Sequence, residues 1–574
     1  MIKRFFFFSL VLLICGVSCA QIARIESEQI PRTKLIAQGG YWKSSGTAPN
    51  YPEALEAAFR FGCYASECTV RETSDHVWVV VVEEPVRKRI SDDISYAQLQ
   101  QSEARFFTLD EFILQYPWAI DTKKSPRHKQ VVNPSKSDSP TKLLLNFHPC
   151  APVKQIDGLT ALLTKILSDS KFRQLVEFCS DDLSVCMALS NRFPDIPNMY
   201  MKGNFSPREL KKKGFHGGCV YERSTLVAHP QWTQDAVALE MPVGVSGIQT
   251  ADDLTGKALM GVSLVFTDNL ALVNAWLQQK STVKLMSFNI RMSGMPDVDG
   301  DNAWDNRKNA VVKMITSEDP DVFGVQEMLP DQQEFLRQEL TEYEMVGVGR
   351  DDGQEQGECM GILYKKNRFE LLKNGTFWLS ETPEVPSMGW DAACKRTVTY
   401  VQLKDRKNGK KFFYFNTHLD HVGLIARQES VKLIAAKIRE LVPDTNSVII
   451  LGGDMNTPLT QNIFIPLIGE RIKSGPKEKM VMAGKQLPNS SKEGMPMESV
   501  DQRTPAMMKS ARNTAWERDN MQTYNGFGKD KPSQIDHIFT SRRVENLVFR
   551  TVRDSYGVPY VSDHYPVTLV FVLK

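Results

Sequence analysis

The chain has 574 residues, of which 42% are hydrophobic and 24% are charged, and its formal net charge is +2. This length exceeds what a single hydrophobic core usually supports, so we expect at least two domains. The balanced charge gives no basic excess and argues against a dedicated nucleic-acid-binding protein, although a nuclease is not excluded.

The first 20 residues have the pattern of a secretory signal peptide. Lys3 and Arg4 precede an apolar run over residues 5–17, and small residues at 18–20 provide a cleavage site. The run is shorter than the roughly 20 residues of a transmembrane helix, and no second long apolar segment follows. We therefore expect an exported protein, periplasmic or extracellular, with no transmembrane segment in the mature chain. A lipid-anchored outer-membrane form, modified at Cys19, is the alternative.

Eight cysteines follow the signal segment, and their spacings match no zinc-binding pattern. An exported protein could form disulfides, yet several of these cysteines lie in apolar runs, where free buried thiols are common. Both states therefore stay open for Cys63, Cys68, Cys150, Cys179, Cys186, Cys219, Cys359 and Cys394.

Residues 21–277 alternate apolar strand-like runs with helix-like stretches. The runs Leu35–Ala37, Val77–Val82 and Leu143–Leu145 are separated by stretches such as Pro52–Phe61. Such alternation predicts a parallel α/β architecture, and the length suits a (β/α)8 TIM-like barrel.

Four short segments of this region resemble the glycerophosphodiester phosphodiesterase family, over about residues 34–276. They are Leu35–Trp42, Glu67–Val70, Phe205–Pro207 and Thr267–Asn269. The resemblance implies the same barrel, with a polar pocket at the carboxyl ends of its strands.

The catalytic pattern of that family is degenerate in this chain. The positions of its histidines, its arginine and several of its metal-binding acids are occupied by Gln38, Gly39, Val82, Thr69 and Asn146. That chemistry needs two imidazoles for proton transfer and several carboxylates for a cation. We therefore expect an inactive barrel that serves as a binding module or a scaffold. A weak cation site at Glu67 and Glu83 is the less favoured alternative.

A short polar linker at residues 278–282 precedes a second domain at 283–574. Within this domain, residues 473–523 are polar and rich in Lys, Met and Pro. This composition predicts an insertion or long loop beside the site, with a helix near Pro505–Asn520.

Six strand-like runs of the second domain end on polar side chains or carry them. In the clearest, Val448–Leu451 is typical of a buried strand, and two glycines then lead to Asp454 and Asn456. Residues two apart in a strand share a face, so a carboxylate and an amide emerge together, as a phosphate or metal site requires. An ordinary Asx turn would explain this run alone. The others are Val283–Asn289, Val322–Glu327, Phe412–His421, Gln534–Phe539 and Ser562–His564.

These six blocks, in this order, resemble the endonuclease/exonuclease/phosphatase superfamily, over residues 282–574. This superfamily includes deoxyribonuclease I, inositol-polyphosphate phosphatases and neutral sphingomyelinases. Two further segments, Thr376–Ser380 and Gly389–Ala392, resemble a bacterial branch of it. The resemblance implies a two-sheet α/β sandwich with the site at one edge, and phosphoester cleavage that depends on Mg²⁺ or Mn²⁺.

The resemblance also assigns roles to individual residues. Asn289, Glu327 and Asp563 would hold the cation. The catalytic set would be His418, Asp454, Asn456, Asp536 and His564. His564 would act as general base or polarise the phosphate, and Asp536 would fix its tautomer. Asp454 and Asn456 would orient the attacking water, while His418 would bind the phosphate.

Substrate contacts are predicted from a few further residues. Arg291, Arg307 and Arg396 could each clamp a phosphate in a bidentate manner, ordinary surface arginines being the alternative. Asp420 and His421 are candidates that not all branches of the superfamily carry.

These features favour a secreted metal-dependent phosphoester hydrolase acting on a small phosphorylated molecule or a lipid headgroup. A secreted nuclease is the alternative, and it would place stacking aromatics such as Trp304, Trp378 and Trp390 in a basic groove. A non-catalytic ligand-binding protein is the third interpretation.

Overall fold

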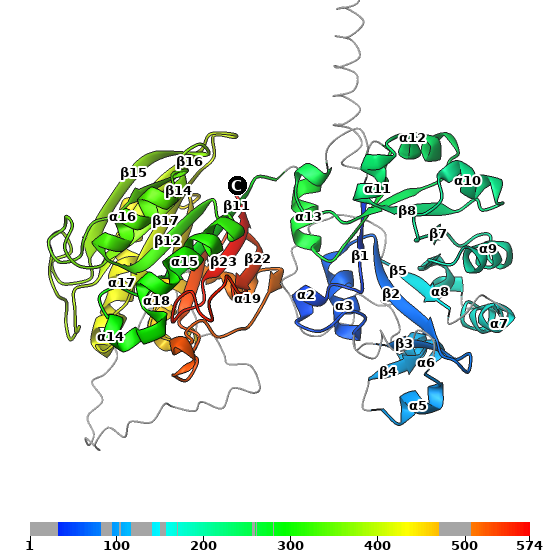
Figure 1. Cartoon of the computed structure of the whole chain (residues 1–574), viewed down its shortest axis with the longest axis horizontal. Coiled ribbons are helices and arrows are strands. Elements are labelled where there is room, and N and C mark those ends of the chain that lie inside the picture. The colour runs from blue at the N-terminus through cyan, green and yellow to red at the C-terminus, as the bar shows by residue number, and fades with distance from the viewer. Residues whose placement is uncertain are drawn as a thin grey trace, which may run out of the picture. The chain divides into compact units, whose positions relative to one another are not determined.

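The computed structural model covers the whole chain and describes residues 33–81, 94–102, 105–115, 141–149, 156–168, 170–254, 259, 261–278, 280–469 and 507–573. The chain divides into two compact units, Met1–Gln279 and Lys280–Lys574 (Figure 1). The predicted signal segment, Val82, Glu83, Cys150 and residues 473–506 lie outside the described residues. Within those residues, no helix has both the length and the apolar character needed to cross a membrane.

The N-terminal unit contains the predicted closed barrel of eight parallel strands. The first strand pairs with both the second and the last, which closes the sheet. In spatial order the strands are β1 (Lys34–Ala37), β2 (Ala65–Glu72), β5 (Lys142–His148), β6 (Val176–Ser180), β7 (Asn198–Tyr200), β8 (Gly218–Glu222), β9 (Val243–Ser246) and β10 (Leu264–Thr267). Side chains fill the interior, including Ile36, Leu144, Met199, Val220 and Phe266.

Helices follow most of these strands (Figure 1). Their bounds are α2 (Trp42–Ser45), α3 (Pro52–Phe61), α5 (Tyr96–Gln100), α6 (Leu109–Gln115), α7 (Ile156–Ile166), α8 (Ser170–Gln174), α9 (Leu183–Arg192), α10 (Pro207–Lys212), α11 (Arg223–Ala228), α12 (Gln231–Ala238), η2 (Asp252–Leu254) and α13 (Leu270–Leu277).

One apolar run of this unit does not form a barrel strand. The run at 77–82 contains β3 (Trp78–Val81), which pairs antiparallel with β2, and β4 (Phe106–Thr108) pairs antiparallel with β3. Only residues 73–77 separate β2 from β3, whereas a parallel crossover needs a dozen or more residues. The prediction that this run belongs to the parallel alternation is therefore wrong.

The C-terminal unit is the predicted two-sheet sandwich. One sheet has the order β13 (Tyr343–Val346), β14 (Cys359–Lys365), β12 (Val322–Met328), β11 (Thr282–Asn289), β23 (Val567–Val572), β22 (Glu545–Thr551) and β20 (Glu517–Arg518). The other has the order β15 (Phe369–Trp378), β16 (Thr397–Asp405), β17 (Lys411–His418), β18 (Val448–Asp454), β21 (Asp536–Ser541) and β19 (Met508–Ser510).

Helices cover the outer faces of both sheets. α15 (Trp304–Glu318) and α16 (Pro330–Glu339) pack on the first sheet, and α17 (Leu424–Leu441) packs on the second. The remaining helices are short: α14 (Pro296–Asp299), η4 (Gly300–Asn302), η5 (Asn462–Phe464), α18 (Ile465–Ile468), α19 (Ala511–Thr514) and η6 (Gly526–Gly528).

The strand β18 shows why four consecutive apolar residues are buried. Val448 and Ile450 face the core between the sheets, whereas Ile449 and Leu451 face the core beneath α17. Both faces of the strand are therefore covered, which removes the polar alternation of a half-exposed strand.

The helix predicted near 505–520 is limited to the four residues of α19 among the residues described there. It lies between β19 and β20. The Ser510 side chain accepts a hydrogen bond from the Asn513 amide and so caps the helix, while Ala515 is already extended.

Strand direction gathers the polar residues at one edge of the sandwich. β11 and β12 are parallel neighbours, and so are β17 and β18. β21 runs antiparallel to β18, so its first residue, Asp536, lies beside Asp454, the last residue of β18. His418 is the partner of Asp454 on its other side.

Candidate active site

His564 and Asp536 form a buried hydrogen-bonded pair. His564 Nδ1 lies 2.8 Å from Asp536 Oδ2, and the two residues are 4% and 1% exposed. A carboxylate accepts hydrogen bonds, so Nδ1 carries the proton. Burial opposes a charge on the ring, but the carboxylates of Asp536 and Asp454 outweigh it and hold the pKa of His564 well above its usual value.

Asp454 connects the residues of this edge. Its Oδ2 lies 3.1 Å from Asn289 Nδ2, 3.4 Å from His418 Nε2 and 3.6 Å from His564 Nε2. Its Oδ1 accepts the backbone amide of Asn456 at 2.9 Å. Burial raises the pKa of Asp454 to about 7, and the Asp536 charge adds to this effect.

Asn456 links Asp454 to His418. Its Nδ2 donates to His418 Nε2 and to the Leu419 carbonyl, both at 2.9 Å. His418 Nε2 therefore accepts, which places the proton of the neutral ring on Nδ1. Burial, helped by the charge of Arg396, holds the pKa of His418 well below its usual value, so His418 is neutral near pH 7.

Glu327 reaches the site through an irregularity in its strand. The register of β12 against β14 shifts between Val325 and Met328, and Glu327 has a φ of 61°. In a regular strand Glu327 would share the face of Val325, which is in the outer core under α15. The bulge instead turns the carboxylate to the edge, where Asn289 Nδ2 donates to its Oε1 at 2.9 Å.

The chemistry of Asn289, Glu327 and Asp563 is compatible with a divalent cation. All three offer oxygen ligands, which hard cations such as Mg²⁺ prefer. Asp563 is 8% exposed. Burial raises the pKa of Asp563, and the neighbouring charge of Glu327 raises it further. A bound cation would offset this repulsion.

Arg291 lies on this acidic side of the site. Its guanidinium makes two hydrogen bonds to Asp299, at 2.9 and 3.2 Å, and lies 3.9 Å from Asp563. Arg307, by contrast, is 1% exposed and donates only to backbone carbonyls, including those of Ile290 and Arg291. The expectation that Arg307 could clamp a phosphate is wrong, because its hydrogen bonds hold loops together.

Asp420 anchors the loop after β17. It is 1% exposed, its Oδ1 accepts the amides of Val422 and Gly423, and its Oδ2 accepts the amide of Ala393 and Arg396 Nε. Burial opposes ionisation, but these amides and Arg396 lower the pKa of Asp420 to about 2. Its oxygens are thus occupied, and we assign Asp420 to positioning the loop rather than to contacting substrate.

Comparison with known proteins identifies the family. The model of the Endonuclease/Exonuclease/phosphatase family matches residues 286–564. A solved endonuclease/exonuclease/phosphatase from Bacteroides vulgatus is 32% identical; the match covers 51% of this chain and all of that one, with a TM-score of 0.42. Residues 286–564 therefore form a domain of the endonuclease/exonuclease/phosphatase family. Members of this family are phosphoesterases or nucleases.

Two other solved structures resemble parts of the chain. A mannosyl-6-phosphatase from Bacteroides thetaiotaomicron is 29% identical, over 50% of this chain and 99% of that one, with a TM-score of 0.42. A glycerophosphodiester phosphodiesterase from Parabacteroides distasonis is 25% identical, over 43% of this chain and 98% of that one, with a TM-score of 0.36. The chain spans 59% or less of the length of the curated relatives that it matches.

The structure brings together all the family residues that the sequence blocks predict. Around Asp454 lie Asn289, Asn456, His418 and His564, and each contacts it within 3.6 Å. The atoms of Asp454, Asp536 and His564 that could bind a metal lie within 4.8 Å of one another. Within this trio, His564 and Asp536 are joined by a hydrogen bond.

Sequence analysis missed two residues beside the site. Arg350 Nη1 lies 2.6 Å from Glu358 Oε2, and Glu358 is 3% exposed. Burial and the charge of Glu327 raise the pKa of Glu358 to about 7. Glu358 directly precedes the apolar strand β14, so a polar residue at a strand end was the signal that could have found it.

Two of the three tryptophans that were candidates for stacking on bases are buried in the domain instead. Trp304 is 6% exposed and packs edge-on against Phe335. Trp378 is 5% exposed, and its Nε1 donates to the Arg350 carbonyl at 2.7 Å. Trp390 is half-buried and has a φ of 51°.

Proposed function

We propose that the C-terminal unit is a divalent-metal-dependent phosphoester hydrolase that acts on a small phosphorylated molecule or a lipid headgroup. The observation that carries this proposal is the environment of Asp454. Its carboxylate is contacted by the His564 imidazole, which Asp536 orients, and by the neutral His418 imidazole. It also accepts hydrogen bonds from the Asn289 side-chain amide and the Asn456 backbone amide. Packing alone does not require so many polar groups at one strand end.

The residues would divide the chemistry between them. Asp454 would accept a proton from the attacking water, and the His564 imidazolium would donate a hydrogen bond to a phosphoryl oxygen. Asp536 keeps the His564 proton on Nδ1, and neutral His418 holds the Asn456 amide in place. Asn289, Glu327 and Asp563 would hold the cation. When bound, the cation would offset phosphoryl charge and favour an ionised water.

The burial of Trp304 and Trp378 supports a small substrate over the nuclease alternative. These two side chains cannot stack on bases in a groove while they pack in the core. The printed activity of the Bacteroides thetaiotaomicron neighbour, a mannosyl-6-phosphatase, is in keeping with a phosphorylated small molecule.

Turnover on a panel of substrates tests this proposal. The full chain without residues 1–20 would be assayed with Mg²⁺ or Mn²⁺ on a phosphomonoester, a phosphodiester and plasmid DNA, and again after EDTA treatment. We expect EDTA-sensitive turnover of at least one small ester. Turnover of DNA alone would support the nuclease instead, and a folded protein inactive on every substrate would support the ligand-binding interpretation.

We also propose that the barrel is a non-catalytic module and that the protein is exported. Where its family carries catalytic groups, the described part of this barrel has Gln38, Gly39, Thr69 and Asn146, and Asn146 donates to Glu67 at 2.7 Å. An Asp454→Asn variant that still hydrolysed a glycerophosphodiester would contradict the inactive barrel. Detection of the expressed chain in the cytoplasm with residues 1–20 uncleaved would contradict export.

A further inference from the structure

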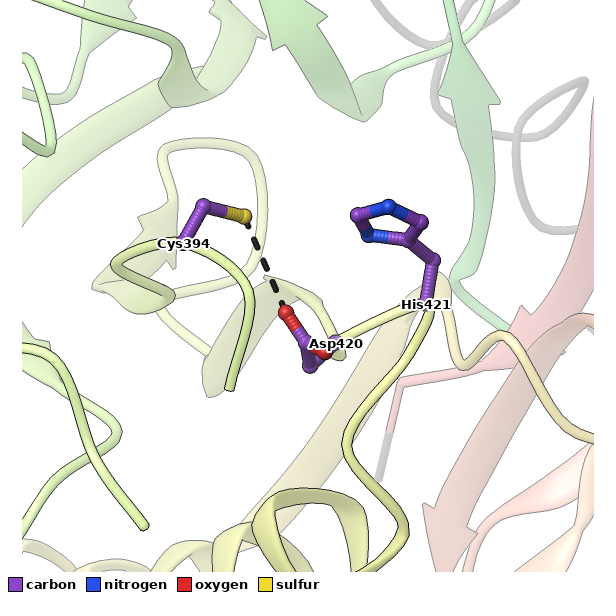
Figure 2. Close-up of side chains that lie close together, drawn as sticks. All are labelled: Cys394, Asp420 and His421. Carbon is purple, nitrogen blue, oxygen red and sulfur yellow. Dashed lines mark hydrogen bonds between the residues drawn. The ribbon is translucent and has the colours of Figure 1, made fainter. Parts of the chain in front are cut away.

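A cluster of side chains beside the catalytic residues is suited to anions rather than to a metal. Ligand atoms of Cys394, Asp420 and His421 lie within 4.8 Å of one another, as in many transition-metal sites. Figure 2 shows Cys394 and His421 on either side of Asp420, with Cys394 hydrogen-bonded to it. Arg396, however, puts its Nε 3.4 Å from Asp420 and its Nη2 3.0 Å from His421 Nδ1. A metal ion would face this fixed positive charge at close range.

Arg396 determines which nitrogen of His421 carries the proton. A guanidinium has donors and no acceptor. His421 Nδ1 must therefore accept the bond from Arg396 Nη2, and the ring proton lies on Nε2. His421 is exposed, so its Nε2–H remains as a hydrogen-bond donor at the rim of the site.

Arg396 itself is fixed and keeps donors to spare. Its side chain is 6% exposed, and Asp420, tied down by three backbone amides, holds its Nε. Its Nη1 makes no hydrogen bond with any residue that the structure describes. Together, Arg396 and His421 offer a pre-organised pair of donors near His418. His421 follows His418 by three residues in the loop after β17, and Arg396 directly precedes β16, which pairs with β17.

We propose that Arg396 and His421 bind a phosphoryl oxygen that carries no ester substituent, so that the substrate is a phosphomonoester. This inference rests on the proposed function. A phosphomonoester has three terminal oxygens, whereas in a diester one of them bears a carbon group. The acidic side of the site, with its cation, and the His564 donor would take two oxygens. Arg396 and His421 take the third.

This arrangement discriminates against diesters for two reasons. A diester has one negative charge less to interact with Arg396, and its carbon group would leave buried donors unpaired. Sites built to hydrogen-bond a polar group reject analogues that lack it far more strongly than apolar pockets reject small changes of shape. The guanidinium adds a charge-assisted bond, which is stronger than a neutral one.

The decisive test compares monoester and diester turnover in His421 and Arg396 variants. We expect kcat/KM of the wild type to be higher for p-nitrophenyl phosphate, a monoester, than for bis-p-nitrophenyl phosphate, a diester. His421→Ala and Arg396→Gln should lower kcat/KM for the monoester by about 10- to 100-fold. Both should leave the diester within about 3-fold of the wild type. His421→Gln keeps a donor and should recover part of the monoester activity.

A binding measurement separates this inference from the proposed function. Calorimetry would compare the binding of inorganic phosphate and of dimethyl phosphate to the wild type, to His421→Ala and to Lys395→Ala, which removes the charge of the half-buried residue next to Arg396. We expect only His421→Ala to lose phosphate affinity. If only His421→Ala lost phosphate affinity but the wild type showed no turnover, the proposed function would be contradicted and the anion subsite would be supported. The monoester inference would be overturned if the wild type preferred the diester, or if the His421 and Arg396 variants lost equal kcat/KM on both esters. Equal losses of phosphate affinity in His421→Ala and Lys395→Ala would also overturn it.

Discussion

His537 Nε2 donates a hydrogen bond to the backbone carbonyl of Thr457, at a distance of 2.8 Å. The bond connects β21, which begins at Asp536, to the turn that carries Asn456. His537 is 3% exposed, and its ring packs against Phe464 and Phe539. The core of the second sheet thereby fixes the backbone of the catalytic turn.

Protonation of His537 should destabilise the fold in acid. Burial lowers the pKa of His537 from 6.5 to about 4, so between these values the unfolded chain binds a proton that the folded chain does not. The free energy of unfolding is therefore unaffected by this group above pH 6.5 and falls as the pH drops toward 4, by about 3 kcal/mol in all.

Urea unfolding of the full chain between pH 7 and pH 4 would measure this effect. His537→Gln keeps a donor for the Thr457 carbonyl but cannot titrate, so its stability should decrease less over the same range. Equal pH dependence in the two proteins would show that His537 is not the group responsible.

Replacement of Glu327 by Gln should separate cation binding from folding. In the wild type, excess Mg²⁺ or Mn²⁺ should raise Tm, because a ligand that binds the folded state stabilises it. Glu327→Gln should lose most of this increase. In EDTA the variant should be at least as stable as the wild type, since the charge that raises the pKa of Asp563 is gone. If the metal raised the Tm of the variant as much as that of the wild type, Glu327 would not be a ligand of the cation.

Arg307→Ala should lower the free energy of unfolding of the C-terminal unit rather than weaken substrate binding. The variant leaves the carbonyls of Ile290, Arg291 and Val561 without their donor. Each unpaired buried group costs about 1–3 kcal/mol, so we expect a total loss of about 3 kcal/mol or more. Lys308→Ala, which removes the neighbouring half-exposed cation, should change stability by less than about 1 kcal/mol. If the Arg307→Ala protein had normal stability and reduced phosphate affinity, Arg307 would be a phosphate-binding residue after all.

The architecture of both units could be predicted because strand periodicity and strand-end chemistry are local properties. The run Val448–Leu451 identified a strand buried on both faces, and its polar continuation located the centre of the site at Asp454. The same rule, applied to each block, found residues that meet only in three dimensions, such as Asn289 and His564.

The features that were missed depend on contacts between distant segments. Nothing in the sequence around Glu327 shows the bulge that turns its carboxylate away from the outer core. The pairing of β3 with β2 was hidden because an apolar run does not show strand direction. Arg307 is surrounded by carbonyls of loops up to 254 positions away in sequence, and only the fold distinguishes it from a substrate-binding arginine.

The turnover of an Asp454→Asn variant tests the central claim most directly, because this carboxylate contacts His418, Asn456 and His564. With Mg²⁺ and p-nitrophenyl phosphate, we expect the variant to lose about 1,000-fold or more in kcat/KM. Its Tm should stay near that of the wild type, since Asn fits the same space. Asp444→Asn, at an exposed position before the same strand, should be fully active. Undiminished turnover in Asp454→Asn would contradict the assignment of this edge of the sandwich as the active site.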